Sequence, residues 1–158
     1  LVSPLDDDPA LLRHNPIGKV PTLVREGERP LVDSRAICAH LDPRARDDHD
    51  RWLESIAHGI MEAALAIVME RRRADGERSD GWMDRQETRL RRVIEALEHD
   101  LPAARDTIGA CALGCALAYV DFRLPDLPWR GGLTRELAAW QEGQVGRESM
   151  VMTRYGIG

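Results

Sequence analysis

The chain has 158 residues, of which 43% are hydrophobic and 31% are charged, so it has enough apolar side chains for a folded core. Its formal net charge of -5 argues against nucleic acid as a partner, because nucleic-acid binders usually present a basic face. The longest apolar run, Ala110 to Val120, is shorter than the roughly 20 residues that cross a bilayer, so no membrane partner is expected.

Three cysteines are present, Cys38, Cys111 and Cys115. A small odd number without framework spacing, and no secretory segment at the start, predict a reducing cytoplasm. Cys111 and Cys115 are four residues apart and would share one helix face. Because no histidine or further cysteine stands beside them, they are interpreted as small core residues rather than a zinc pair, and no metal is expected.

The first elements lie between residues 1 and 24. Leu1-Val2 is typical of the end of a strand, and Pro9 is expected to begin a short helix that ends near His14. Pro21 has no N–H and suits the first position of a following strand. A cis bond between Val20 and Pro21 would turn the N–H and C=O of Val20 outward, where they could hold an extended peptide. The alternative is an ordinary turn before an edge strand.

A β-hairpin and a helix are predicted next. The runs 22–24 and 30–32 are apolar, and a polar loop containing a glycine joins them. Ser34 is the predicted N-cap of a helix whose inward face is Ile37 and Leu41. A helix N-terminus suits a carboxylate ligand, and Asp33 beside it could accept from an ammonium group, so an amino acid would fit both. Taken alone, the pair is simply a cap.

Residues 15–21 and 33–41 together resemble the glutathione-binding half of a glutathione S-transferase. The family pattern is Asn-Pro-x-Gly-Lys-Val-Pro, a hairpin, Glu/Asp-Ser, x-Ala-Ile and x-x-Tyr-Leu, and His40 stands where an aromatic is usual. Residues 116–125 also resemble bacterial members. The resemblance implies an α/β plus all-α fold: a truncated thioredoxin-like domain over 1–42, a linker over 43–48 and an all-helical domain over 49–158.

The resemblance also implies roles in binding glutathione as a co-substrate and transferring its thiolate to a small apolar electrophile. The backbone of Val20 would pair with the cysteinyl part, and Pro21 would set that geometry by its cis bond. Ser34 and the helix amides would hold the γ-glutamyl carboxylate, with Asp33 near the ammonium group. Lys19 would lie near the glycyl end.

The catalytic residue is expected upstream of Leu1, because in this family the Ser, Tyr or Cys that activates the thiol follows the first strand. About one strand-helix-strand segment would precede this sequence, which favours a piece of a longer protein over a degenerate relative. Two other functions remain open: a non-catalytic binding or interaction module, and a disulfide or dehydroascorbate reductase. Family members are commonly homodimers, so a second copy is an expected partner.

The remainder is predicted to be helical. A helix over 49–73 carries two apolar stripes, one for the core and the other for a partner subunit or an apolar substrate pocket; the alternative is a core helix that is covered on both sides. Ser79 would cap the next helix, with Trp82 among its inward residues. A helix over 107–121 is apolar nearly all round. The family usually has Asp at the position of Ala110, so a capping contact worth about 1 kcal/mol is expected to be lost.

Overall fold

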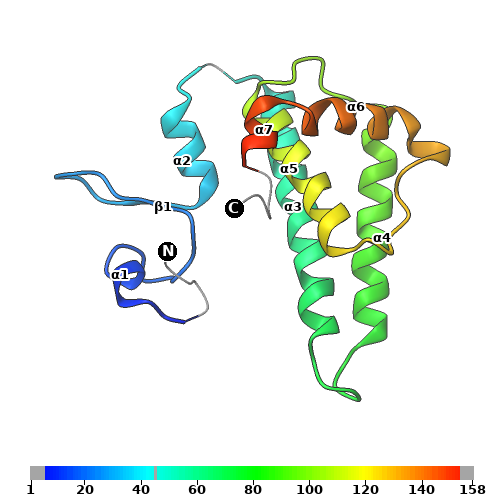
Figure 1. Cartoon of the computed structure of the whole chain (residues 1–158), viewed down its shortest axis with the longest axis horizontal. Coiled ribbons are helices and arrows are strands. Elements are labelled where there is room, and N and C mark those ends of the chain that lie inside the picture. The colour runs from blue at the N-terminus through cyan, green and yellow to red at the C-terminus, as the bar shows by residue number, and fades with distance from the viewer. Residues whose placement is uncertain (1–5, 45, 154–158) are drawn as a thin grey trace. The chain divides into compact units, whose positions relative to one another are not determined.

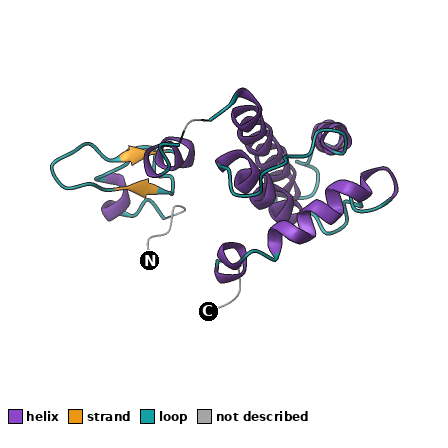
Figure 2. Ribbon diagram, turned by 90° about the horizontal axis from the view of Figure 1, so that it is seen from above, coloured by secondary structure: helices purple, strands orange, loops and turns teal. Residues whose placement is uncertain are grey.

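The computed structural model describes residues 6–44 and 46–153 (Figure 1). The chain divides into two compact units, Leu1–Ala45 and Arg46–Gly158. In the described residues, the first unit holds two short strands and two helices, and the second contains helices and no strand (Figure 2). This is the α/β and helical composition that the sequence predicts.

The first unit begins with α1 (Pro9–Leu12), at the position where a helix starting with a proline is expected. The carboxylate of Asp8 accepts a hydrogen bond from the N–H of Ala10 at 2.8 Å and so caps the helix. Proline is tolerated at the first helical position because its missing N–H has no partner there. Leu11 is buried and anchors this turn.

A two-stranded antiparallel hairpin forms the centre of the first unit. Strand β1 (Thr22–Leu23) pairs with β2 (Leu31–Val32), with Thr22 opposite Val32 and Leu23 opposite Leu31. The predicted hairpin is therefore confirmed, although each strand is shorter than its apolar run. Helix α2 (Ser34–Leu41) follows β2 directly and packs against both strands.

The start and inward face of α2 correct two predictions. The capping residue is Asp33, whose side chain accepts from the N–H of Arg35, and Ser34 is the first residue of the helix. Asp33 is the cap because it immediately precedes the helix, where its carboxylate meets the N–H of the second helical residue. Ile37 is buried as expected, but Leu41 is 66% exposed, since it lies in the last turn of a short helix.

The second unit is a bundle built around one long helix. It comprises α3 (Asp48–Arg71), α4 (Asp80–Leu97), α5 (Ile108–Arg123), a 3₁₀ turn η1 (Gly132–Thr134), α6 (Arg135–Val145) and α7 (Glu148–Met152). Helix α3 packs against both α4 and α5. By length and composition α3 is apolar enough to cross a membrane, but core helices of water-soluble proteins pass the same test, and α3 contributes much of this core.

The buried face of α3 takes residues from both predicted stripes instead of keeping them apart. It contains Leu53, Ala57, Ile60, Ala63, Ala64 and Ile67. The helix lies between two neighbours, so its covered surface is wider than one stripe. Leu65 and Met69, from one of the stripes, are about half exposed, at 48% and 51%.

Helix α4 has its predicted cap at Ser79, α5 is capped by Thr107, and two buried positions differ from the prediction. The Ser79 hydroxyl accepts from the N–H of Trp82 at 3.3 Å, and Thr107 accepts from that of Ala110 at 3.2 Å. The indole of Trp82 was expected to face inward, yet Trp82 is 44% exposed because it lies in the first turn of α4. Cys115 is exposed and Cys111 half-buried, so the core interpretation of this pair is wrong.

Candidate functional site

A loop held by one buried asparagine leads into β1. Asn15 is 2% exposed. Its Nδ2 donates to the C=O of Lys19 at 2.7 Å and to Oγ1 of Thr22 at 3.2 Å, while its Oδ1 accepts from the N–H of Ile17 at 3.1 Å. The Thr22 hydroxyl donates to the same Lys19 carbonyl at 3.1 Å. These bonds fix the path of the chain between residues 15 and 22.

The backbone of Val20 lies at the exposed end of this loop. The Val20–Pro21 peptide bond is cis, and Val20 is 50% exposed. Within residues 6–44, no hydrogen bond engages the N–H or the C=O of Val20. A donor and an acceptor on one exposed residue are the groups that an added extended peptide pairs with.

The start of α2 is built on a strained residue. Asp33 has φ 75 and ψ 131, a conformation that is sparsely populated for any residue other than glycine and costs on the order of 1–3 kcal/mol. Its Oδ1 accepts from the N–H of Arg35 at 2.8 Å, which offsets part of that strain. Ser34 is half-buried at the first helical position, beside amides that carry the positive end of the helix dipole.

The hairpin register places these two groups at the same end of the sheet. Because Thr22 lies opposite Val32, residues 20–21 immediately precede β1 where residues 33–34 immediately follow β2. The structure thus puts Val20, Pro21, Asp33 and Ser34 at one end of the hairpin. Lys19 belongs to the same loop through its carbonyl, and its side chain is exposed.

Asn15 is the residue that sequence reasoning missed. It opens the Asn-Pro motif, and an asparagine side chain commonly bonds backbone groups a few residues on. That chemistry was a usable signal for a loop-fixing role. Burial of Asn15 depends on Leu11 and Thr22 folding around it, and the local sequence does not reveal this.

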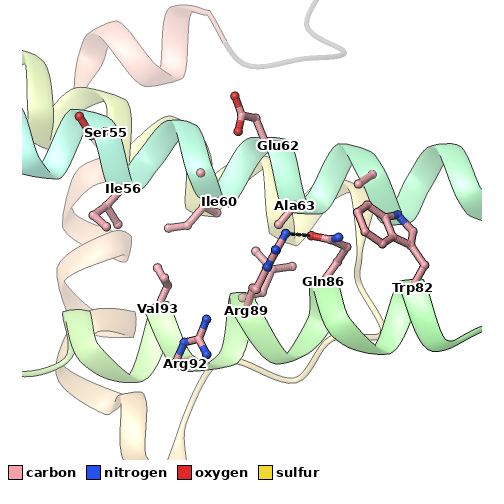
Figure 3. A pocket seen from close by; sticks show the side chains of 13 residues that line it. Ser55, Ile56, Ile60, Glu62, Ala63, Trp82, Gln86, Arg89, Arg92 and Val93 are labelled. Carbon is pink, nitrogen blue, oxygen red and sulfur yellow. Dashed lines mark hydrogen bonds between the residues drawn. The ribbon is translucent and has the colours of Figure 1, made fainter.

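The second unit contains two larger hollows. One lies between α3 and α4, has a volume of about 450 Å³ and is lined by apolar side chains with Gln86, Arg89 and Arg92 (Figure 3). The other, of about 730 Å³, is lined by residues of α5, α6 and α7, including Cys115, Tyr119 and Phe122. No cluster of three or more His, Cys, Asp or Glu side chains suited to a metal ion occurs among the residues described.

Comparison with known proteins gives a consistent set of relatives. The family model "Glutathione S-transferase, N-terminal domain" matches residues 1–44. The chain is 31% identical over 136 residues to the GST-like protein YibF of Escherichia coli (strain K12), covering 76% of this chain and 67% of that protein.

Two solved structures extend the similarity to both units. A glutathione transferase family member from Pseudomonas fluorescens Pf-5, with bound glutathione, has a TM-score of 0.88 and 36% identity over 98% of this chain and 82% of that one. A glutathione S-transferase from Methylobacillus flagellatus KT, with glutathione bound, has a TM-score of 0.80 and 30% identity over 92% and 81%. These similarities confirm the predicted fold class, and the chain belongs to the glutathione S-transferase family.

Proposed function

We propose that the protein binds glutathione and joins its sulfur to an electrophilic substrate. The observation that carries this proposal is the meeting of the Val20 backbone and the start of α2 at one end of the hairpin. Glutathione is a short peptide with an amino-acid head, so it needs a strand-like contact and a carboxylate site next to one another. Relatives with glutathione in their crystal structures support the choice of ligand.

The peptide contact is assigned to Val20. Its N–H would donate to, and its C=O accept from, the cysteinyl part of glutathione, as when a strand is added to a sheet edge. The network around Asn15 holds this backbone in place before the ligand arrives, so little ordering cost remains to be met on binding.

The γ-glutamyl head is assigned to the start of α2. The hydroxyl of Ser34 and the first amides of the helix would donate to the carboxylate, and the helix dipole favours its negative charge. The carboxylate of Asp33 would accept from the ammonium group. Lys19 would pair with the glycyl carboxylate, since an exposed lysine is free to turn toward a negative group.

The chemistry is nucleophilic attack by sulfur. The thiol first loses its proton, because the thiolate is the reactive form. The sulfur then forms a bond to the electrophilic carbon, and the leaving group departs with the electron pair of the broken bond. The residue that lowers the thiol pKa is proposed to precede Leu1, so no residue of the described ranges receives that role.

Calorimetric titration of the purified chain with glutathione tests the binding half. Ser34→Ala should raise the dissociation constant for glutathione by roughly 10- to 100-fold, since a hydrogen bond to a charged group contributes about 1.5–3 kcal/mol. Ser149→Ala, at an exposed position on α7, is the matched control. Absence of glutathione binding by the unaltered chain sinks the proposal.

The conjugation part of the proposal is tested by mixing the protein with glutathione and an activated aryl halide and measuring the halide ion that is released. Binding with halide release supports the transferase. Binding without halide release in the longest natural form of the protein would favour the alternative, a non-catalytic binding module of the same fold.

A homodimer in the cytoplasm is proposed as the working state, with the hollow between α3 and α4 as part of the contact. Its α3 wall carries Glu62 and its α4 wall carries Arg89 and Arg92 (Figure 3). In a two-fold contact the same patch meets itself, so acid and base would face each other. Light scattering should report twice the chain mass, and Arg89→Glu with Arg92→Glu should yield monomers.

A further inference from the structure

Three sulfur-containing side chains gather where the segment of α7 meets α5. Cys111 and Cys115 are four positions apart on α5, so their side chains leave the same face of that helix. The Sγ of Cys115 lies 3.9 Å from the Sδ of Met150 on α7. The Sγ of Cys111 lies 3.5 Å from Nη1 of Arg147, the residue directly before α7. Both cysteines therefore face the same short segment, and Cys111, Cys115 and Met150 are together called the sulfur cluster.

The sulfur cluster can be reached by a small ion. Both cysteines are thiols, of which Cys115 is exposed and Cys111 is half-buried. Cys115 and Met150 also line the hollow of about 730 Å³ described above. A metal site needs such an entry path as well as its ligands.

The spacing of the sulfur atoms suits one shared metal ion. A metal–sulfur bond is about 2.3 Å long, so two sulfurs that are 3.9 Å apart on one ion make an angle of roughly 116° at the ion, near that of a planar three-ligand site. Side chains four positions apart on a helix can hold the same ion, as two histidines at this spacing do in helical zinc sites. Cys111 and Cys115 have this spacing.

The types of ligand favour a soft monovalent ion. Thiolate and thioether sulfur select copper(I), whereas structural zinc sites are closed by four ligands. Among the residues that the structure describes, no third His, Cys, Asp or Glu joins the two cysteines to complete such a zinc site. Two thiolates around a monovalent ion leave one net negative charge, and the guanidinium of Arg147 beside Cys111 offsets it.

We propose that Cys111, Cys115 and Met150 form a three-coordinate site for a soft monovalent metal ion, of which copper(I) fits best. The two thiols release their protons as the two sulfur–metal bonds form, and the thioether of Met150 donates a lone pair as the third ligand. The metal keeps its oxidation state throughout. The cysteine pair alone did not indicate this site, because Met150 is 35 positions from Cys115. The site is independent of glutathione binding, which is assigned to the first unit.

Metal binding should also hold α7 in place. This helix has five residues, and none of them is buried. The N–H of Val151 donates to the carbonyl of Arg147 at 2.9 Å, and this bond breaks whenever α7 unfolds. An ion shared by Met150 and α5 stabilises the folded segment, so amide exchange of Val151 should slow by about ten-fold or more when the site is filled.

Anaerobic titration of the purified chain with copper(I), against the coloured copper(I) chelator bicinchoninate, tests the site. Glutathione is left out because its own thiol binds copper. The chain should withhold one copper ion from the chelator, and X-ray absorption should report three sulfur neighbours at about 2.3 Å. Transfer of all the copper to the chelator, or an ion with only two sulfur neighbours, overturns the proposal.

Substitutions assign the ligands. Cys111→Ser and Cys115→Ser should each abolish the retention of copper. Met150→Leu keeps a similar side-chain volume but has no sulfur. It should weaken copper binding by at least about ten-fold, because even residues that only orient metal ligands change affinity by about 10–100-fold. It should also remove the effect of copper on amide exchange of Val151.

Two matched controls complete the test. Cys38→Ser, at an exposed cysteine of the first unit, and Met152→Leu, at the exposed end of α7, should bind copper as the unaltered chain does. Loss of binding in Cys38→Ser, or full binding in Cys115→Ser or Met150→Leu, contradicts the proposal. If Cys111→Ser does not fold, these last two variants decide, since Cys115 is exposed and its replacement leaves the core intact.

Discussion

Arg71, the last residue of α3, makes a two-pronged ion pair with Asp126 in the segment between α5 and η1. Nη1 lies 3.0 Å from Oδ1 and Nη2 lies 2.8 Å from Oδ2. The hydrogen bonds from Arg71 hold the pKa of Asp126 below its usual range. The pair joins the far end of α3 to a connection 55 residues later, and Glu87 of α4 lies near the same guanidinium at 3.6 Å.

Replacing this arginine should have a small effect. Arg71→Lys removes the paired geometry but keeps the charge, and the side chain of Asp126 is 61% exposed. Exposed pairs contribute about 0.2–1 kcal/mol, so the free energy of unfolding should fall by no more than about 1 kcal/mol. Urea denaturation with and without about 1 M added salt is the measurement, because salt at that concentration screens exposed pairs. A decrease in the free energy of unfolding several times larger than this would mean that the Arg71 side chain also contributes to core packing.

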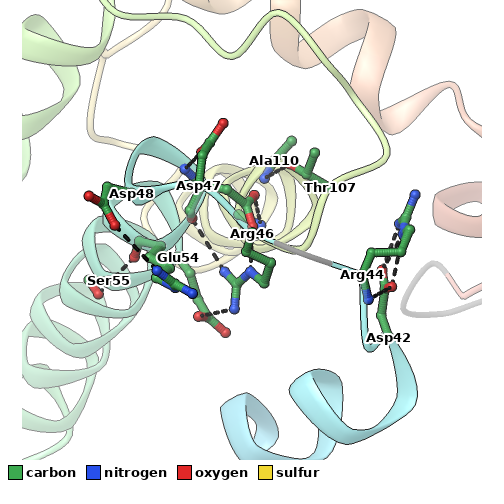
Figure 4. Close-up of polar contacts among 12 residues, drawn as sticks. Asp42, Arg44, Arg46, Asp47, Asp48, Glu54, Ser55, Thr107 and Ala110 are labelled. Atoms are coloured by element: carbon green, nitrogen blue, oxygen red, sulfur yellow. Dashed lines mark hydrogen bonds and ion pairs between the residues drawn. The ribbon is translucent and has the colours of Figure 1, made fainter.

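Acid should weaken the contact between Asp50 of α3 and the first turn of α5, in which Oδ1 of Asp50 accepts from the N–H of Gly109 at 2.7 Å (Figure 4). Burial alone would raise the pKa of Asp50, but hydrogen bonds from Thr107, Arg46 and Gly109 outweigh it and lower that pKa. A lowered folded pKa means that the stabilisation is complete above the unfolded value of about 3.9 and is lost as pH falls through the folded value.

The stability difference between the unaltered protein and Asp50→Asn should therefore stay constant from neutral pH to about pH 5 and shrink below about pH 4. Urea unfolding of both proteins at a series of pH values measures it. A stability difference between the two proteins that grows as pH falls would contradict the lowered pKa assigned to Asp50.

Gly114 should not tolerate even a methyl group. A Cβ there would lie 2.5 Å from Cγ of Gln144, which is fully buried and donates to the carbonyls of Arg105 and Ala110, each at 3.0 Å. Gly114→Ala should lower the free energy of unfolding by about 1–3 kcal/mol, the usual cost of overpacking. Gly81→Ala, at a position on α4 with open space around it, is the control and should cause no loss.

Asn15→Ala should disorder the loop before β1. It removes one of the two donors to the carbonyl of Lys19, which keeps only the Thr22 hydroxyl, and the acceptor of the Ile17 N–H, and each lost hydrogen bond costs about 0.5–1.5 kcal/mol. Under the proposed function, glutathione affinity should fall with it, because Val20 loses its fixed position. Calorimetry on Asn15→Ala and on Thr22→Val, which removes only the hydroxyl, should rank the first variant as the more severe. Equal glutathione affinity in the unaltered protein, Asn15→Ala and Thr22→Val would show that the order of this loop does not affect glutathione binding.

Much of the fold follows from local patterns. The hairpin was predicted from two apolar runs and a glycine-containing loop, and the start of α4 was predicted from the hydroxyl residue Ser79. These features depend on neighbours within a few positions, so the sequence reveals them. The same holds for the motif residues at the hairpin end.

The remaining features depend on residues far apart in the chain. The cap that Asp50 gives to Gly109 spans 59 positions, and those that Glu98 gives to the start of α6 span 38 and 39, so no window of sequence contains both partners. Cys115 and Trp82 follow an apolar period yet are exposed, Trp82 by 44%, because periodicity does not tell how completely a neighbouring helix covers each position. Leu41 was misplaced for the same reason.

The hairpin also offers a place for labelling. Its register puts residues 20–21 and 33–34 at one end, so the polar turn over 25–29 lies at the opposite end of the two strands. Gly27 in that turn has φ 73 and nothing within 4 Å of the position a side chain would take. A fluorophore or a short affinity sequence placed in this turn would extend into open space, leaving the motif end of the sheet accessible for spectroscopy or surface capture.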